Sequence, residues 1–170
     1  MKMKIYVLLV FLLLASAATA ASAQADNSNL ELKAGWNLIS SPVEDGIPSE
    51  KFSAQCKIKS GPWIWDAGLG NYVQTKNLQP YVGTWVKVEK DCSVSFFDTK
   101  IKTMKDLLLK KSWNLISGIG QLSDFGGCAI KSGPWEYNTS KKNYVKTDVF
   151  NPDKGYWIKV KSDCVLAEKK

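Results

Sequence analysis

The sequence predicts an all-β protein built from two tandem antiparallel units. A stretch from Cys56 to Cys92 recurs from Cys128 to Cys164 without a gap, and roughly half of its positions are identical. Between turn signals the segments are short, and many alternate apolar and polar residues with a period of two. After the N-terminal segment no long stretch has helical periodicity. We therefore expect two small barrel- or sandwich-like units that follow an N-terminal signal helix.

Residues 1–25 have the pattern of a secretory signal. Lys2 and Lys4 precede an apolar run from Ile5 to Leu14, and small residues follow up to Ala25. The run is shorter than the roughly 20 residues that a membrane-spanning helix needs. We expect a secreted, extracellular or cell-surface protein. If the segment stayed uncleaved, it would be the chain's one contact with a membrane.

The duplication divides the rest of the chain into a first unit at residues 26–97, a linker at 98–105 and a second unit at 106–170. Each unit opens with a strand–turn–strand pattern, at residues 30–40 and 107–117. The segment that follows is five residues longer in the first unit, which is typical of a surface loop. We expect a short helical turn before each first cysteine.

Within each duplicated stretch the pattern predicts a hairpin and then a further strand. The hairpin covers residues 63–73 in the first unit, and the strand covers residues 83–88. Alternation turns Val86 and Val88 toward the core, so Trp85 shares the opposite face with Lys87. The second unit repeats this arrangement 72 residues later, with Trp157 beside Lys159.

Four cysteines allow three disulfide pairings. A unit that was copied whole should close on itself, which gives Cys56–Cys92 and Cys128–Cys164. Each bridge would contribute about 4 kcal/mol by restricting the unfolded chain. A zinc site is the competing interpretation, but the sequence has no histidine and no paired C-x-x-C spacing. We expect no metal and no cofactor.

Composition argues against catalysis and against a nucleic-acid partner. All 23 cationic residues are lysine, so the chain lacks the planar fork of arginine and the neutral-range titration of histidine. The net charge of +7 is then best explained by a solvated lysine surface. The acidic positions common to both copies, Asp91 and Asp163, sit in turns beside the closing cysteines. We expect no enzyme activity.

The aromatic residues provide the candidate binding site. The tryptophans that recur at matching places are expected to be core residues: Trp36, Trp63, Trp113 and Trp135. The candidate ligand-binding residues are those that alternation places on the polar face, together with one tyrosine found in the first copy alone: Trp85, Trp157, Lys87, Lys159 and Tyr81. Asn138 begins a glycosylation sequon in a predicted hairpin loop.

Two signatures carry a family resemblance. GWNLIS from Gly35 opens the first unit, and GYWIKV from Gly155 closes the second. They resemble a repeat of secreted and cell-surface proteins of archaea and bacteria, and the resemblance covers nearly all of the mature chain. Ser112 and Thr84 depart from it, since they replace the opening glycine and the closing tyrosine. The resemblance implies an extracellular tandem module and brings no catalytic or ligand residues with it.

These observations favour a non-catalytic secreted or cell-surface interaction or structural module made of two disulfide-bonded β repeats. Its partner would be an extracellular or cell-surface protein or glycan. The alternative is a carbohydrate-binding module that uses exposed Trp85 and Trp157. An enzyme of the carboxylate type and a self-assembling surface subunit are further alternatives, the latter because small open sheets have exposed edges.

Overall fold

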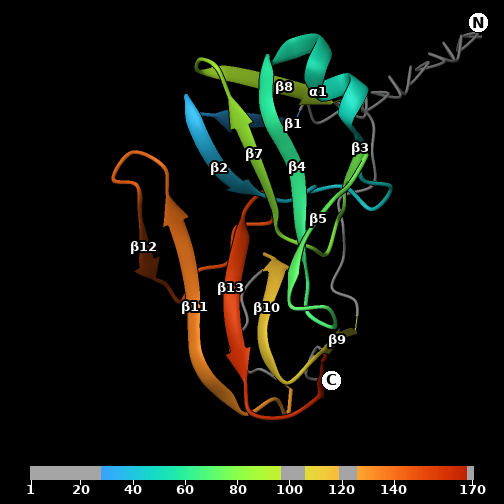
Figure 1. Ribbon diagram of the computed structural model, residues 1–170, viewed down its shortest axis with the longest axis vertical. Helices are drawn as coiled ribbons and strands as arrows, with labels where there is room; N and C mark the ends of the chain where they lie inside the picture. Colours follow the sequence, from blue (N-terminus) through green and yellow to red (C-terminus); the bar gives the residue numbers. More distant parts are fainter. Residues whose placement is uncertain (1–27, 97–105, 119–125, 168–170) are drawn as a thin grey trace, which may run out of the picture.

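The computed structural model describes residues 28–96, 106–118 and 126–167, and these residues form mostly antiparallel β-strands with one helix (Figure 1). The all-β class, the antiparallel sheets and the two disulfides are confirmed. The predicted signal segment and linker lie outside the described ranges. Within those ranges no helix is both long and apolar enough to cross a bilayer.

The first unit is built on a four-stranded sheet of order β2-β7-β4-β5, and two short ribbons, β1-β8 and β3-β6, accompany it. Its elements are β1 (Ser28–Leu32), β2 (Gly35–Ile39), β3 (Ile47–Pro48), α1 (Ser49–Gln55), β4 (Ile58–Asp66), β5 (Asn71–Gln74), β6 (Asn77–Leu78), β7 (Thr84–Val88) and β8 (Cys92–Phe96). The predicted hairpin is β4-β5, and the helical turn before Cys56 is α1.

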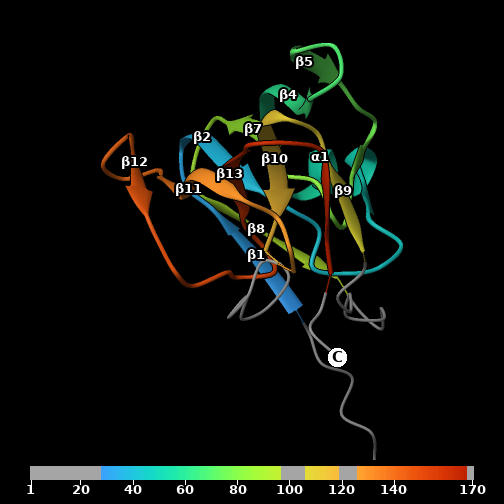
Figure 2. The ribbon, with the colours of Figure 1, turned by 90° about the horizontal axis from the view of Figure 1, so that it is seen from below.

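The second unit repeats this plan with a sheet of order β10-β13-β11-β12 and one ribbon, β9-β14. Its elements are β9 (Leu107–Leu109), β10 (Ser112–Ser117), β11 (Ile130–Asn138), β12 (Asn143–Lys146), β13 (Gly155–Val160) and β14 (Cys164–Leu166). In Figures 1 and 2 the two units, coloured blue to green and yellow to red, pack directly against each other.

Each unit has its own core, which lies between its four-stranded sheet and its ribbon. Leu30 and Leu32 of β1 pack there with Val86 and Val88 of β7, as the alternation predicts. In the second unit Ile158 and Val160 of β13 meet Leu166 of β14. Burial of these side chains contributes about 1.5–3 kcal/mol each. The cores therefore use only one face of each four-stranded sheet.

The disulfides close both units in the predicted pairing. Cys56 bonds to Cys92 and Cys128 bonds to Cys164, each across 36 residues of chain. The Cα atoms lie 5.7 and 5.4 Å apart, within the usual range for a bridge. Each bridge ties the segment before the long central strand to the first residue of the closing ribbon strand.

Asp91 and Asp163 hold the opening turn of each unit. The Asp91 carboxylate accepts hydrogen bonds from the backbone N–H of Ala34 at 2.8 Å and from Lys33 Nζ at 2.9 Å. The Lys33 and Ala34 bonds hold the Asp91 pKa below its usual value. Asp163 makes the equivalent bonds to Lys111 and Lys110, which lower its pKa in the same way.

The two units meet in a reciprocal, pseudo-two-fold interface. Ile39 forms a β-bridge with Lys154, and the equivalent Ile116 forms one with Val82. Leu38 and Leu115 are each 4 % exposed, yet both lie outside the two cores and pack at this boundary. Such mutual contacts are the pattern of an isologous dimer interface, here formed within one chain.

Two glycines allow this close approach. A Cβ atom added at Gly155 would lie 2.9 Å from the Cα of Gly83, and one added at Gly83 would lie 2.8 Å from Leu115. Neither distance can accommodate a side chain without moving one unit away from the other. The glycines that precede β7 and open β13 therefore fix how closely the two sheets approach each other.

Candidate functional site

The face of each four-stranded sheet that points away from its core carries rows of aromatic side chains. Residues directly opposite each other on paired strands share a face. In the first unit Trp36 lies opposite Lys87, and Trp85 lies opposite both Leu38 and Trp63. In the second unit Trp113 lies opposite Lys159, and Trp157 lies opposite both Leu115 and Trp135. The hairpins extend these rows, with Trp65 opposite Tyr72 and Tyr137 opposite Tyr144.

The expectation that four of the tryptophans are core residues is wrong. Trp36, Trp63, Trp113 and Trp135 are half-buried and belong to neither core. The reason is the strand register, which turns them to the same face as Trp85 and Trp157, while aliphatic residues with a few phenylalanines and Tyr156 fill the cores. All seven tryptophans of the chain therefore lie on this face, and we call them, with Tyr72, Tyr137 and Tyr144, the aromatic face.

Ring contacts join the two halves of the aromatic face across the unit boundary. Trp65 meets Trp157 with ring centroids 5.3 Å apart, and the equivalent pair, Tyr137 and Trp85, is 4.8 Å apart. Both pairs are edge-to-face, the favoured geometry of aromatic rings. The indole N–H of Trp65 also donates to the carbonyl of Trp113 at 3.0 Å. The face is thus one continuous surface built by both units.

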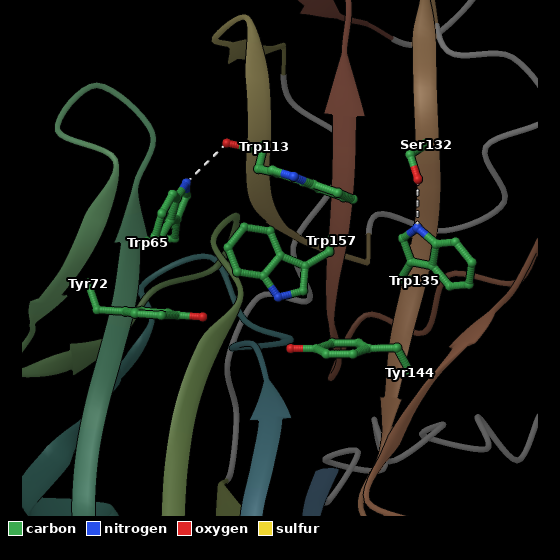
Figure 3. A pocket seen from close by; sticks show the side chains of 7 residues that line it. All are labelled: Trp65, Tyr72, Trp113, Ser132, Trp135, Tyr144 and Trp157. Atoms are coloured by element: carbon green, nitrogen blue, oxygen red, sulfur yellow. Dashed lines mark hydrogen bonds between the residues drawn. The ribbon is translucent and has the colours of Figure 1, made fainter.

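Two pockets open on the aromatic face, related by the same pseudo-two-fold arrangement. The Trp157 pocket has a volume of about 590 Å³ and combines rings from both units (Figure 3). It is lined by Trp65, Tyr72, Trp113, Ser132, Trp135, Tyr144 and Trp157. The Trp85 pocket has a volume of about 550 Å³. It is lined by Trp36, Ser60, Trp63, Tyr72, Trp85 and Tyr137.

Internal partners occupy the polar edges of several of these rings. Trp63 donates its indole N–H to Ser60 Oγ at 3.1 Å, and Trp135 donates to Ser132 Oγ at 3.0 Å. Figure 3 shows the second bond at the wall of the Trp157 pocket. Because these N–H groups are satisfied within the fold, the pockets offer ring faces and edges to a ligand. Fixed rings of this kind are prepared for stacking before a ligand arrives.

Two tyrosines of the hairpins line the pockets: Tyr72 contributes to both, and Tyr144 contributes to the Trp157 pocket. Tyr72 and Tyr144 are each 45 % exposed, and in Figure 3 their hydroxyl groups point toward each other beneath Trp157. Burial raises the pKa of both hydroxyls, and for Tyr72 the nearby Tyr144 hydroxyl raises it further. Both groups therefore stay protonated at neutral pH and are available as hydrogen-bond donors and acceptors.

Lysines border the pockets. Lys87 Nζ lies 5.7 Å from the ring centroid of Trp36, and Lys159 Nζ lies 5.3 Å from that of Trp113. These are cation–π distances, and the ammonium groups lie over the rings. Lys146 of β12 lies directly opposite Trp135, whereas Gln74 takes the equivalent place opposite Trp63. The two pockets thus differ in charge.

The structure brings together four of the five predicted ligand-binding residues. Trp85 and Trp157 line the pockets, and Lys87 and Lys159 border them. Tyr81 lines neither pocket, and its carbonyl accepts the Ser117 N–H at the unit boundary.

Two further outcomes concern the predicted glycosylation residue and two residues that the sequence did not single out. Asn138 ends β11, and its side-chain oxygen accepts the backbone N–H of Lys141 at 2.9 Å within the hairpin loop. The sequence interpretation missed Tyr72 and Tyr144 as site residues. The signal that would have found them is their place opposite Trp65 and Tyr137 in each hairpin.

Comparison with protein-family models, with curated proteins and with solved structures finds no match to this chain. The chemistry of the site must then be argued from its residues. The lining of the two pockets consists of tryptophan, tyrosine and serine. Within the described residues no group of three histidine, cysteine, aspartate or glutamate side chains lies close enough to hold a metal ion. These side chains suit stacking and hydrogen bonding to a ligand.

Proposed function

We propose that this chain is an exported, non-catalytic binding module whose aromatic face holds carbohydrate. The observation that carries the proposal is the pair of adjoining pockets formed by Trp and Tyr rings. One side of a pyranose ring presents C–H groups, and such a surface stacks on an aromatic ring while its hydroxyls reach outward. Concave, mostly apolar sites with a few polar groups are the usual form of a ligand site.

The pocket lining supports a binding role over catalysis. A hydrolase of the carboxylate type needs an acid and a second carboxylate across the scissile bond. Neither pocket has an aspartate or glutamate among its lining residues. Asp91 and Asp163 instead hold backbone turns, so their lowered pKa values have a structural cause.

An extracellular address is part of the proposal. Two disulfides in small β units are compatible with an oxidising compartment, and residues 1–25 have the pattern of an export signal. We propose two sandwich-like repeats, each a sheet and a ribbon packed around one core. The partner would be a glycan or protein at the cell surface, without nucleic acid.

A protein-interaction or structural role is the second candidate. The observation that favours it is strand β12, which lies at the edge of its sheet and is exposed along its length from Asn143 to Lys146. An unpaired strand edge can accept a strand from another protein or another copy. This role does not need the aromatic face, so the two candidates can be separated by mutation.

A glycan array probed with the mature protein tests the proposal. We expect a defined group of glycans to bind, and the double substitution Trp85→Ala/Trp157→Ala, which removes one ring from each pocket, to weaken binding roughly 30-fold, the usual effect of removing a hot-spot residue. Tyr81→Ala is the matched control, because Tyr81 is an aromatic residue outside both pockets. An array without any bound glycan, or a double tryptophan variant that binds as well as the wild type, would overturn the proposal.

A further inference from the structure

We propose that the aromatic face selects acidic polysaccharides, in which carboxylates of uronic acid residues pair with its lysines, and that the Trp157 pocket binds them more tightly than the Trp85 pocket. This inference rests on the proposed function and adds the ligand class to it. It comes from the charges around the pockets and from one difference between the two units.

The charged side chains that share the aromatic face are lysines. Register places Lys87, Lys146 and Lys159 on it, while the lining of the pockets contributes no carboxylate. The ion pairs within the described residues use other lysines, namely Lys33, Lys57, Lys110 and Lys154. The face therefore keeps uncompensated positive charge, which complements an anionic ligand.

The geometry fits an acidic sugar. A uronic acid carries its carboxylate at the rim of a pyranose ring, so a sugar stacked on an indole directs that group to the edge of the stack. Lys159 Nζ lies 5.3 Å from the Trp113 centroid, and Lys87 Nζ lies 5.7 Å from that of Trp36. Each ammonium group thus lies over one ring of the aromatic face, within reach of a carboxylate on a sugar that stacks on a neighbouring ring.

An anionic lipid surface would also attract lysine and aromatic residues, but the shape of this face argues against it. Interfacial aromatic residues have to project into the headgroup layer. Here none of the seven tryptophans is among the exposed large side chains, so their rings do not project from the sheet. Half-buried rings suit stacking against a chain of sugars better than insertion into a bilayer.

Within the paired strands of this face, the units differ in charge at one position. Lys146 borders the Trp157 pocket, whereas the equivalent position beside the Trp85 pocket is Gln74. The Trp157 pocket consequently has two lysines, Lys146 and Lys159, and the Trp85 pocket has one, Lys87. The duplication provides its own matched variants, because Lys146→Gln and Gln74→Lys each give one pocket the charge of the other.

Binding of polygalacturonate, compared with its fully methyl-esterified form, tests the ligand class. The ester has the same sugar rings and no carboxylate charge. We expect polygalacturonate to bind at least tenfold more tightly at low salt, with an advantage that falls as ionic strength rises. Equal binding of the two polymers would overturn this inference and leave the proposed function standing. Binding to neither, together with an empty glycan array, would overturn both.

Lys146→Gln and Gln74→Lys test the difference between the pockets. We expect Lys146→Gln to weaken polygalacturonate binding about threefold to fivefold and Gln74→Lys to strengthen it by a similar factor, as for a single exposed ion pair. Lys161→Gln, an exposed lysine in the turn after β13, controls for net charge. Equal effects of Lys146→Gln and Lys161→Gln would contradict the assignment. Tighter binding to phosphatidylserine vesicles than to polygalacturonate would also overturn it.

Discussion

The two units share a four-stranded sheet and the ribbon that packs on it, but different side chains fill their cores. In the second unit Phe150 packs on Tyr156 with ring centroids 4.8 Å apart. In the first unit the equivalent positions are the smaller Leu78 and Thr84. The longer segment between β2 and Cys56 supplies Val43, Ile47 and Phe52 to the core of the first unit. We expect their volume to take the place of the larger Phe150 and Tyr156 rings.

The aromatic face, in contrast, is nearly the same in both units. Trp36, Trp63, Trp85 and Tyr72 all recur as identical residues at the equivalent places. The core tolerates a different set of side chains if its total volume is kept. Under the proposed function each ring of the aromatic face contacts the ligand, and the two units should then agree on this surface while they differ inside.

The largest expected effect is the loss of a disulfide. We expect Cys56→Ser with Cys92→Ser, and separately Cys128→Ser with Cys164→Ser, to lower the free energy of unfolding by about 4 kcal/mol each. The two losses should be equal because both bridges span 36 residues. Urea unfolding measures both losses. If one loss were less than half of the other, the two bridges would not restrict the unfolded chain equally.

A smaller effect is expected from exchanging the core residues. Tyr156→Thr leaves a cavity and removes the hydroxyl that accepts the Asn151 N–H at 2.7 Å, so we expect a loss of about 3 kcal/mol. Thr84→Tyr overfills a core that the insertion already fills and should cost about 2 kcal/mol. If Thr84→Tyr were neutral in urea unfolding, the insertion would not be the replacement for the missing ring.

Backbone strain provides a third test. Gly35 and Ser112 open β2 and β10 with φ of +98° and +94°, values that disfavour a residue with a Cβ. Ser112→Gly should raise the free energy of unfolding by about 0.5–1 kcal/mol, and Gly35→Ser should lower it by a similar amount. No atom crowds a Cβ at Gly35, so its substitution tests backbone conformation alone. Effects of the same sign would contradict this explanation.

The smallest effect should appear in the pH dependence of stability. The pKa values of Asp91 and Asp163 are lower in the folded state than in the unfolded state. Their contribution to the free energy of unfolding is therefore complete above the unfolded-state pKa of about 4, and it is lost as the pH falls through the folded-state values. Wild type should therefore exceed Asp91→Asn/Asp163→Asn in Tm at pH 6 and lose this advantage in acid. An advantage that persists at pH 2 would assign the effect to another cause.

The sequence was sufficient to predict the β class, the disulfide pairing and the faces of the closing strands. The duplication determined the pairing, and alternation within β7 and β13 separated Val86 from Trp85. The face of Trp36 and Trp63 could not be predicted, because it depends on the register of β2 and β4 with β7. The pockets were also beyond prediction, since they require Trp65 of one unit to meet Trp157 of the other.

The central claim is that one face, shared by both units, provides two separate binding pockets. Calorimetric titration with trigalacturonate tests this claim most directly, because stoichiometry counts the sites. We predict two sites on the wild-type protein. Trp157→Ala should leave only the weaker of them, in the Trp85 pocket, and Trp85→Ala should leave only the tighter one, in the Trp157 pocket. A single site on the wild type, or a stoichiometry that neither substitution changes, would contradict the account.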